Sequence, residues 1–117
     1  MPAARRKGAG DGTFLEFVLD QLDRLRGIES RAMFGGHGLY LNGTFFAILW
    51  RGRLYFRTDA VTRADYQARG MKPFRPRTWQ TLGSYYEVPA EVLEDPAEIA
   101  RWARAAVAVR VGSARRR

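Results

Sequence analysis

The stretch Leu39–Arg57, LYLNGTFFAILWRGRLYFR, decides the fold of this 117-residue chain. Asn42-Gly43 separates two apolar runs and predicts a hairpin, because both central residues of a type I′ turn need a positive φ. The run Thr44–Trp50 is apolar on both faces, as expected of a central strand that is covered on two sides. Arg51-Gly52 is a second turn signal, so the stretch predicts an antiparallel meander of three strands.

Amphipathic helices are predicted on both sides of this meander. Over residues 13–26, apolar residues recur at helical spacing after the capping box Thr13-x-x-Glu16, and a glycine follows. Over residues 96–109, the same spacing follows Asp95-Pro96, which combines a helix N-cap with proline at the first helical position.

The segment between the meander and the last helix gives weaker signals. Asp59 or Thr62 is expected to cap a short helix that Gly70 ends. Residues 71–81 hold two prolines and are predicted to be a loop, residues 82–88 a fourth strand, and residues 89–93 one helical turn. The predicted fold class is therefore α+β: an antiparallel meander sheet packed with an N-terminal and a C-terminal helix plus a short middle helix.

Composition predicts one folded domain over residues 13–109, because 46% of the chain is hydrophobic. Residues 1–12 and 110–117 are predicted to be disordered basic tails. Residues 1–7 and 110–117 hold seven of the 20 Lys and Arg and no acid, which leaves residues 8–109 at +1 of the chain's net +8. The longest apolar run has six residues, so we expect a cytoplasmic protein that does not enter a membrane.

The charge within the domain is polarised along the sequence. Residues 78–98 hold five acids and no base, whereas residues 51–77 hold eight bases and two acids. These eight are candidate contacts to nucleic acid or to a partner: Arg51, Arg53, Arg57, Arg63, Arg69, Lys72, Arg75 and Arg77. Cations bind phosphates, and aromatic residues of the same block can stack on bases. The alternative is that the aromatic residues belong to the core and that the basic block faces the acidic block within the fold or is simply solvated.

The residue inventory gives no support for catalysis. The chain has no cysteine and one histidine, which excludes thiolate chemistry and multi-histidine metal sites. No serine lies in a G-x-S-x-G elbow. The glycines at 35, 36 and 38 lead into a strand rather than a helix, so they predict a tight turn or bulge around His37 and not a phosphate loop. We therefore expect no enzyme activity, no catalytic residue, no cofactor and no metal.

Two motifs give the chain a family resemblance. Residues 31–40, RAMFGGHGLY, and residues 84–89, SYYEVP, resemble the N-terminal domain of the TfoX/Sxy family, and the likeness covers about residues 13–109. Position 37 is usually aromatic in that family. The motif residues singled out by the resemblance are Met33, Phe34, Gly35, Gly36, His37, Gly38, Tyr85, Tyr86 and Pro89.

The resemblance implies a bacterial protein with a small α+β domain and a role linked to natural competence, that is, to DNA transformation. Full-length members act as transcriptional co-activators with the cyclic-AMP receptor protein and have a second, C-terminal helical domain. No counterpart of that second domain is present in residues 1–117, so a single-domain member is expected.

The leading hypothesis is a non-enzymatic regulatory or interaction module. It would act in transcription regulation through a protein partner, with nonspecific attraction to DNA, and would be a monomer or a weak homodimer. One alternative is a small-ligand binder or enzyme with a pocket near His37 and Tyr40. Another is a homodimerising scaffold whose apolar strands pair across an interface.

Overall fold

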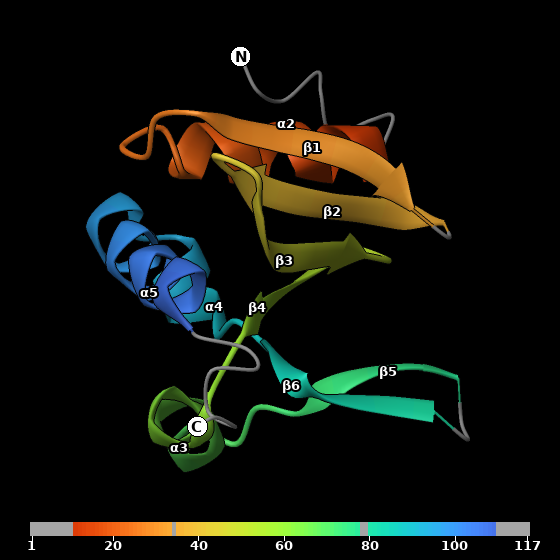
Figure 1. Ribbon diagram of the computed structural model, residues 1–117, viewed down its shortest axis with the longest axis vertical. Helices are drawn as coiled ribbons and strands as arrows, with labels where there is room; N and C mark the ends of the chain where they lie inside the picture. The colour runs from red at the N-terminus through yellow and green to blue at the C-terminus, as the bar shows by residue number, and fades with distance from the viewer. Residues whose placement is uncertain (1–10, 34, 78–79, 110–117) are drawn as a thin grey trace.

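A computed structural model describes residues 11–33, 35–77 and 80–109. These residues form four helices and six strands. In chain order they are α2 (Asp11–Gln21), β1 (Ile28–Met33), β2 (Gly36–Leu41), β3 (Thr44–Trp50), β4 (Arg53–Arg57), α3 (Ala60–Ala68), β5 (Pro73–Arg77), β6 (Gln80–Glu87), α4 (Ala90–Leu93) and α5 (Pro96–Ala108). The strands form one antiparallel sheet in the order β1-β2-β3-β4-β6-β5 (Figure 1). The α+β class is confirmed.

No helix in the described part of the chain is long and apolar enough to cross a membrane. Residues 1–10 and 110–117, where the basic tails are predicted, lie outside the described residues, whereas 11 and 12 belong to α2 and not to a tail.

The predicted meander is present as β2, β3 and β4. Asn42 and Gly43 have φ values of 50° and 87°, and Arg51 and Gly52 have 52° and 77°, so both tight turns use the left-handed region. β3 is paired on both sides, and its middle residues 46–49 are buried, as the two-sided apolar pattern predicted. The register between β2 and β3 shifts by one residue after Leu39, which is a β-bulge.

Two strands were not predicted, one at each edge of the sheet. β1 is mostly exposed, so its sequence lacks the alternation that marks a half-buried strand. The prediction of a loop over residues 71–81 was wrong, because β5 and the start of β6 occupy most of it. Pro73 and Pro76 are tolerated in β5 because an edge strand needs hydrogen bonds on one side only.

The helices agree with prediction to different degrees. α2 begins two residues before the predicted start and ends at Gln21 rather than at residue 26, so Thr13 lies inside the helix and is not its N-cap. Asp59 caps α3 in a reciprocal pair with Thr62, as one of the two predicted alternatives. Asp95 caps α5, with Pro96 at its first position, as predicted.

The sheet has a large core on its helical face and a smaller one on the other face. The large core joins α2, α5 and Tyr66 of α3 to the strands, with Phe46 and Phe56 fully buried at its centre. The smaller core consists of Ile48, Tyr55 and Phe74, and the residues packed around it also come from strands. Figure 1 shows the β5–β6 hairpin extending away from α2. The two faces of the sheet are therefore covered differently: helices pack on one face, and only strand residues form the core on the other.

Candidate interaction surfaces

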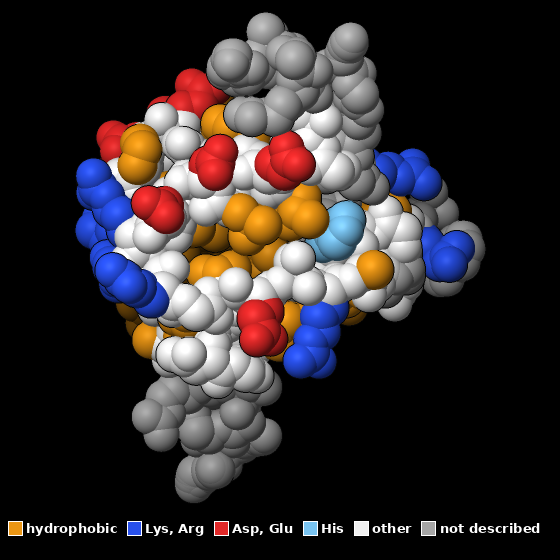
Figure 2. All heavy atoms as spheres, turned by 90° about the horizontal axis from the view of Figure 1, so that it is seen from above, with side chains coloured by type: hydrophobic (Ala, Val, Ile, Leu, Met, Phe, Trp, Pro, Cys, Tyr) orange, Lys and Arg blue, Asp and Glu red, His pale blue; other side chains and the backbone are white. Residues whose placement is uncertain are grey.

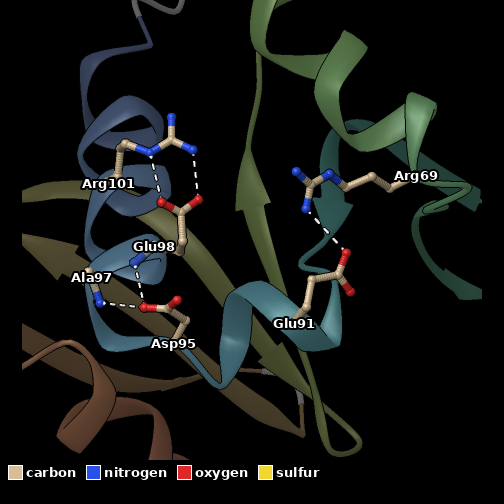
Figure 3. Close-up of polar contacts among 6 residues, drawn as sticks. All are labelled: Arg69, Glu91, Asp95, Ala97, Glu98 and Arg101. Atoms are coloured by element: carbon tan, nitrogen blue, oxygen red, sulfur yellow. Dashed lines mark hydrogen bonds and ion pairs between the residues drawn. The ribbon is translucent and has the colours of Figure 1, made fainter.

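Two of the predicted basic contacts are ion-paired within the fold. Arg53 on β4 donates to both carboxylate oxygens of Glu87 on β6 at 3.0 Å. Arg69 donates to Glu91 of α4 at 3.2 Å (Figure 3). The guanidinium carbon of Arg69 also lies 5.0 Å from the ring centroid of Trp102. Both acids belong to the acidic block 78–98, so these pairs neutralise part of the charge contrast seen in the sequence.

Two further arginines of the basic block bind polar groups of the fold. Arg57 is half-buried, and its Nη2 donates to the backbone oxygen of Val109 at 3.3 Å, which ties β4 to the end of α5. Arg63 on α3 donates through Nε to the hydroxyl of Thr58 at 3.2 Å. That hydroxyl donates in turn to the backbone oxygen of Ser84 at 3.0 Å. These contacts favour a structural role for both arginines.

The other four basic residues, Arg51, Lys72, Arg75 and Arg77, are exposed. The structure brings Arg51 and Arg77 to one cleft of about 520 Å³, between the β3–β4 turn and the β5–β6 hairpin. The described residues that line this cleft include no acid: Gly35, Trp50, Arg51, Pro76, Arg77, Gln80 and Leu82. The eight predicted contacts therefore do not form one surface.

Aromatic side chains continue along the same face of the sheet. The ring of Phe45 lies 5.1 Å from that of Tyr40 and 5.7 Å from that of Tyr85, measured between centroids. The guanidinium carbon of Arg31 lies 4.8 Å from the centroid of Tyr40. Burial raises the pKa of Tyr85, and Arg57 partly opposes that shift, so the phenol is neutral at physiological pH.

The glycine motif forms a turn at Gly35, as predicted, and then the start of a strand. Gly35 alone has a positive φ, of 88°, while Gly36 and Gly38 lie in β2. A Cβ on Gly36 would overlap the backbone oxygen of Leu49, and one on Gly38 would come within 2.8 Å of both Met33 and Phe45. Gly36 and Gly38 are therefore explained by close packing, and Gly35 by its positive φ. Phe34 lies outside the described residues.

His37 was predicted to lie in the glycine turn, but it lies within β2, paired with Ala32 of β1 and Leu49 of β3. Its imidazole is half-buried, and the buried Nδ1 atom has no hydrogen-bond partner among the described residues. His37 and Tyr40 are three residues apart on one strand, so their side chains project to opposite faces of the sheet. This arrangement argues against a single pocket formed by both.

Residues of the second motif, SYYEVP at 84–89, pack in the large core. Tyr86 on β6 is buried, its ring lies 6.1 Å from that of Tyr66, and its hydroxyl accepts a hydrogen bond from Gln67 at 3.2 Å. Burial raises the pKa of Tyr66 strongly. Pro89 is buried and is the N-cap residue of α4. The contacts of Tyr86 and Pro89 are those of packing residues.

The acids around the start of α5 cap and pair within that helix (Figure 3). One oxygen of Asp95 accepts from the backbone N–H groups of Ala97 and Glu98, at 3.0 and 3.2 Å. Glu98 accepts from Arg101 at 2.7 Å, and this hydrogen bonding lowers the pKa of the Glu98 carboxyl. The direction of the Glu98 shift is opposite to the raised pKa that a general acid needs.

One apolar surface was not predicted from the sequence. A hollow of about 560 Å³ lies between α2 and β1, and Figure 2 shows hydrophobic side chains inside it with acidic side chains on both sides. Its described lining is Leu19, Leu22, Asp23, Leu25, Arg26, Gly27 and Ile28. The available signal was the spacing of Glu16, Asp20 and Asp23, which places three acids along one side of α2 and the turn after it.

The chain matches a known protein-family model. Residues 20–109 match the model of the TfoX N-terminal domain. The matched range includes all six strands and the helices α3, α4 and α5. A search of curated proteins gives no significant match.

Proposed function

Because the chain belongs to the TfoX N-terminal domain family, we propose that it is a non-enzymatic regulatory module that acts in transcription through a protein partner. The competence role known for the family is part of this proposal. The observation that carries it is the hollow between α2 and β1, which has the half-buried Leu19 and Ile28 among its lining residues and opens to solvent beside exposed acids. Such a hollow offers a seat for an apolar side chain of a partner.

The charge around the hollow indicates the chemistry of the partner. Glu16 and Asp20 on α2, Asp23 after it and Glu29 on β1 are all exposed, and they outnumber the exposed Arg24 and Arg26 beside the hollow. A partner segment with apolar residues on one side and Lys or Arg at its margins would match both features. We therefore assign the hollow to a basic amphipathic segment of a protein partner.

The proposal adds a nonspecific attraction to DNA. Positive charge for this attraction comes from the basic residues of segments 1–7 and 110–117. The exposed arginines on the sheet face opposite the helices add to it. Attraction of this kind weakens steeply as the salt concentration rises. It would keep the module near DNA without recognising a sequence.

A pull-down from the native cell tests the proposal. The intact chain is compared with a version that lacks residues 1–10 and 110–117, and with Leu19→Glu in the hollow. The matched control is Val61→Glu, because Val61 on α3 is 79% exposed and lies away from the hollow lining. We expect the truncated chain and Val61→Glu to retain a partner that Leu19→Glu loses, with all variants folded by circular dichroism. Equal retention by Leu19→Glu would refute the assignment of the hollow.

A further inference from the structure

The cleft between the β3–β4 turn and the β5–β6 hairpin combines positive charge with an aromatic wall. Arg51 and Trp50 form one side, and Pro76 and Arg77 of β5 lie among the residues that line it. Its volume of about 520 Å³ lies within the usual range of ligand sites, roughly 300–1,000 Å³. With two arginines and no acid in the described lining, the cleft favours an anionic ligand.

Trp50 is held in place by its neighbours. Its ring meets Phe74 edge-on, with centroids 5.3 Å apart and an interplanar angle of 83°. The guanidinium carbon of Arg51 lies 4.5 Å from the Trp50 ring centroid. Gly35 presents no side chain beside the indole nitrogen, which would lie 3.9 Å from a Cβ at that position. The cleft therefore has a fixed, half-buried ring at its wall.

The same pairing of arginine and aromatic ring recurs along this face, where Arg31 lies over Tyr40. Proteins that bind single strands without sequence preference combine basic side chains for the phosphates with aromatic rings for the bases. In a duplex the bases are already stacked and paired, so a duplex would engage the arginines only. An acidic peptide would also leave the ring unused.

We propose that this cleft binds single-stranded nucleic acid, with Arg51 and Arg77 on the phosphates and Trp50 stacked on a base. The inference rests on the nucleic-acid part of the proposed function and names its ligand as an unpaired strand. It is independent of the hollow between α2 and β1, which lies on another surface.

Fluorescence anisotropy of a labelled oligothymidylate of about 12 nucleotides tests the inference with the full-length chain. A hairpin duplex and poly-glutamate serve as the competing ligands. We expect the single strand to bind more tightly than either. The double variant Arg51→Ala/Arg77→Ala should reduce the slope of log affinity against log salt by about 1.4, since each phosphate contact on a single strand contributes about 0.7. Trp50→Leu should weaken single-strand binding at least about fivefold.

Arg104→Ala is the matched control, because it removes an exposed arginine from α5, outside the cleft lining. The basic ends of the chain are present in every variant, so their contribution cancels. The inference would be overturned if the double variant bound the single strand with the same affinity as Arg104→Ala. Equal affinity of the protein for duplex, poly-glutamate and single strand would also overturn it. Absence of all DNA binding at low salt would also remove the nucleic-acid part of the proposed function, whereas duplex binding alone would leave that part standing.

Discussion

Arg53 and Glu87 form an ion pair across the neighbouring strands β4 and β6, with one guanidinium nitrogen 3.0 Å from each carboxylate oxygen. The Arg53 side chain is 59% exposed and that of Glu87 is 21% exposed. A double-mutant cycle of Arg53→Ala and Glu87→Ala should therefore give a coupling of only about 0.2–1 kcal/mol in urea unfolding. The coupling should shrink in about 1 M salt, and a salt-independent value would contradict this account.

Gly36→Ala should destabilise the protein by about 1–3 kcal/mol or more, because the new Cβ would overlap the backbone oxygen of Leu49 in the adjacent strand. Gly83→Ala is the control, since a Cβ there has no atom within 4 Å. Urea unfolding of both variants checks the prediction. Equal stabilities would show that the sheet can shift to accommodate position 36.

Phe74→Ala should lower the free energy of unfolding by about 3–5 kcal/mol, because Phe74 is fully buried over Tyr55 with ring centroids 4.8 Å apart. Burial is the main cause that raises the pKa of Tyr55, so the pKa should move toward its ordinary value in the variant. Ultraviolet titration and chemical unfolding measure the two effects. Val61→Ala, at an exposed site, should change neither.

Asp59→Ala should cost about 0.5–2 kcal/mol near neutral pH, because the carboxylate caps α3. The backbone N–H of Thr62 is the main cause that lowers the Asp59 pKa below 3.8. A carboxyl whose pKa is lower in the folded state than in the unfolded state stabilises the fold at pH values above its unfolded pKa. This stabilisation is lost as the pH falls through the folded pKa. The stability difference from the wild type should therefore narrow below pH 3.8. A pH series of unfolding curves tests this, with Asp65→Ala from the same helix as the control.

The fold was predictable where a local signal agreed with the tertiary environment. Asn42-Gly43, Asp95-Pro96 and the two-sided apolar run of β3 all have local causes, and the structure contains the elements they predicted. β5 was missed because prolines mark a loop unless the strand lies at an edge, and strand order is not visible locally. β1 was missed because an exposed edge strand has no alternating pattern.

The candidate sites were less predictable than the fold. The basic block was visible as charge in the sequence, but which arginines form ion pairs or hydrogen bonds within the fold depends on Glu87, Glu91 and Val109, which lie far along the chain. The hollow was hidden for a similar reason. Its apolar residues have helical spacing, which predicts burial, and only the position of β1 decides how much of them stays open.

The strand order has a consequence for self-association. The most apolar strands, β3 and β4, are paired on both sides, so another copy of the chain cannot add to them without breaking the sheet. Only β1 and β5 have open edges within the described sheet. β5 holds two prolines, which have no N–H to donate to a new neighbour, and β1 carries the exposed charges Glu29 and Arg31. The sheet thus places its aggregation-prone sequences at its centre and its poorest templates for fibril growth at its margins.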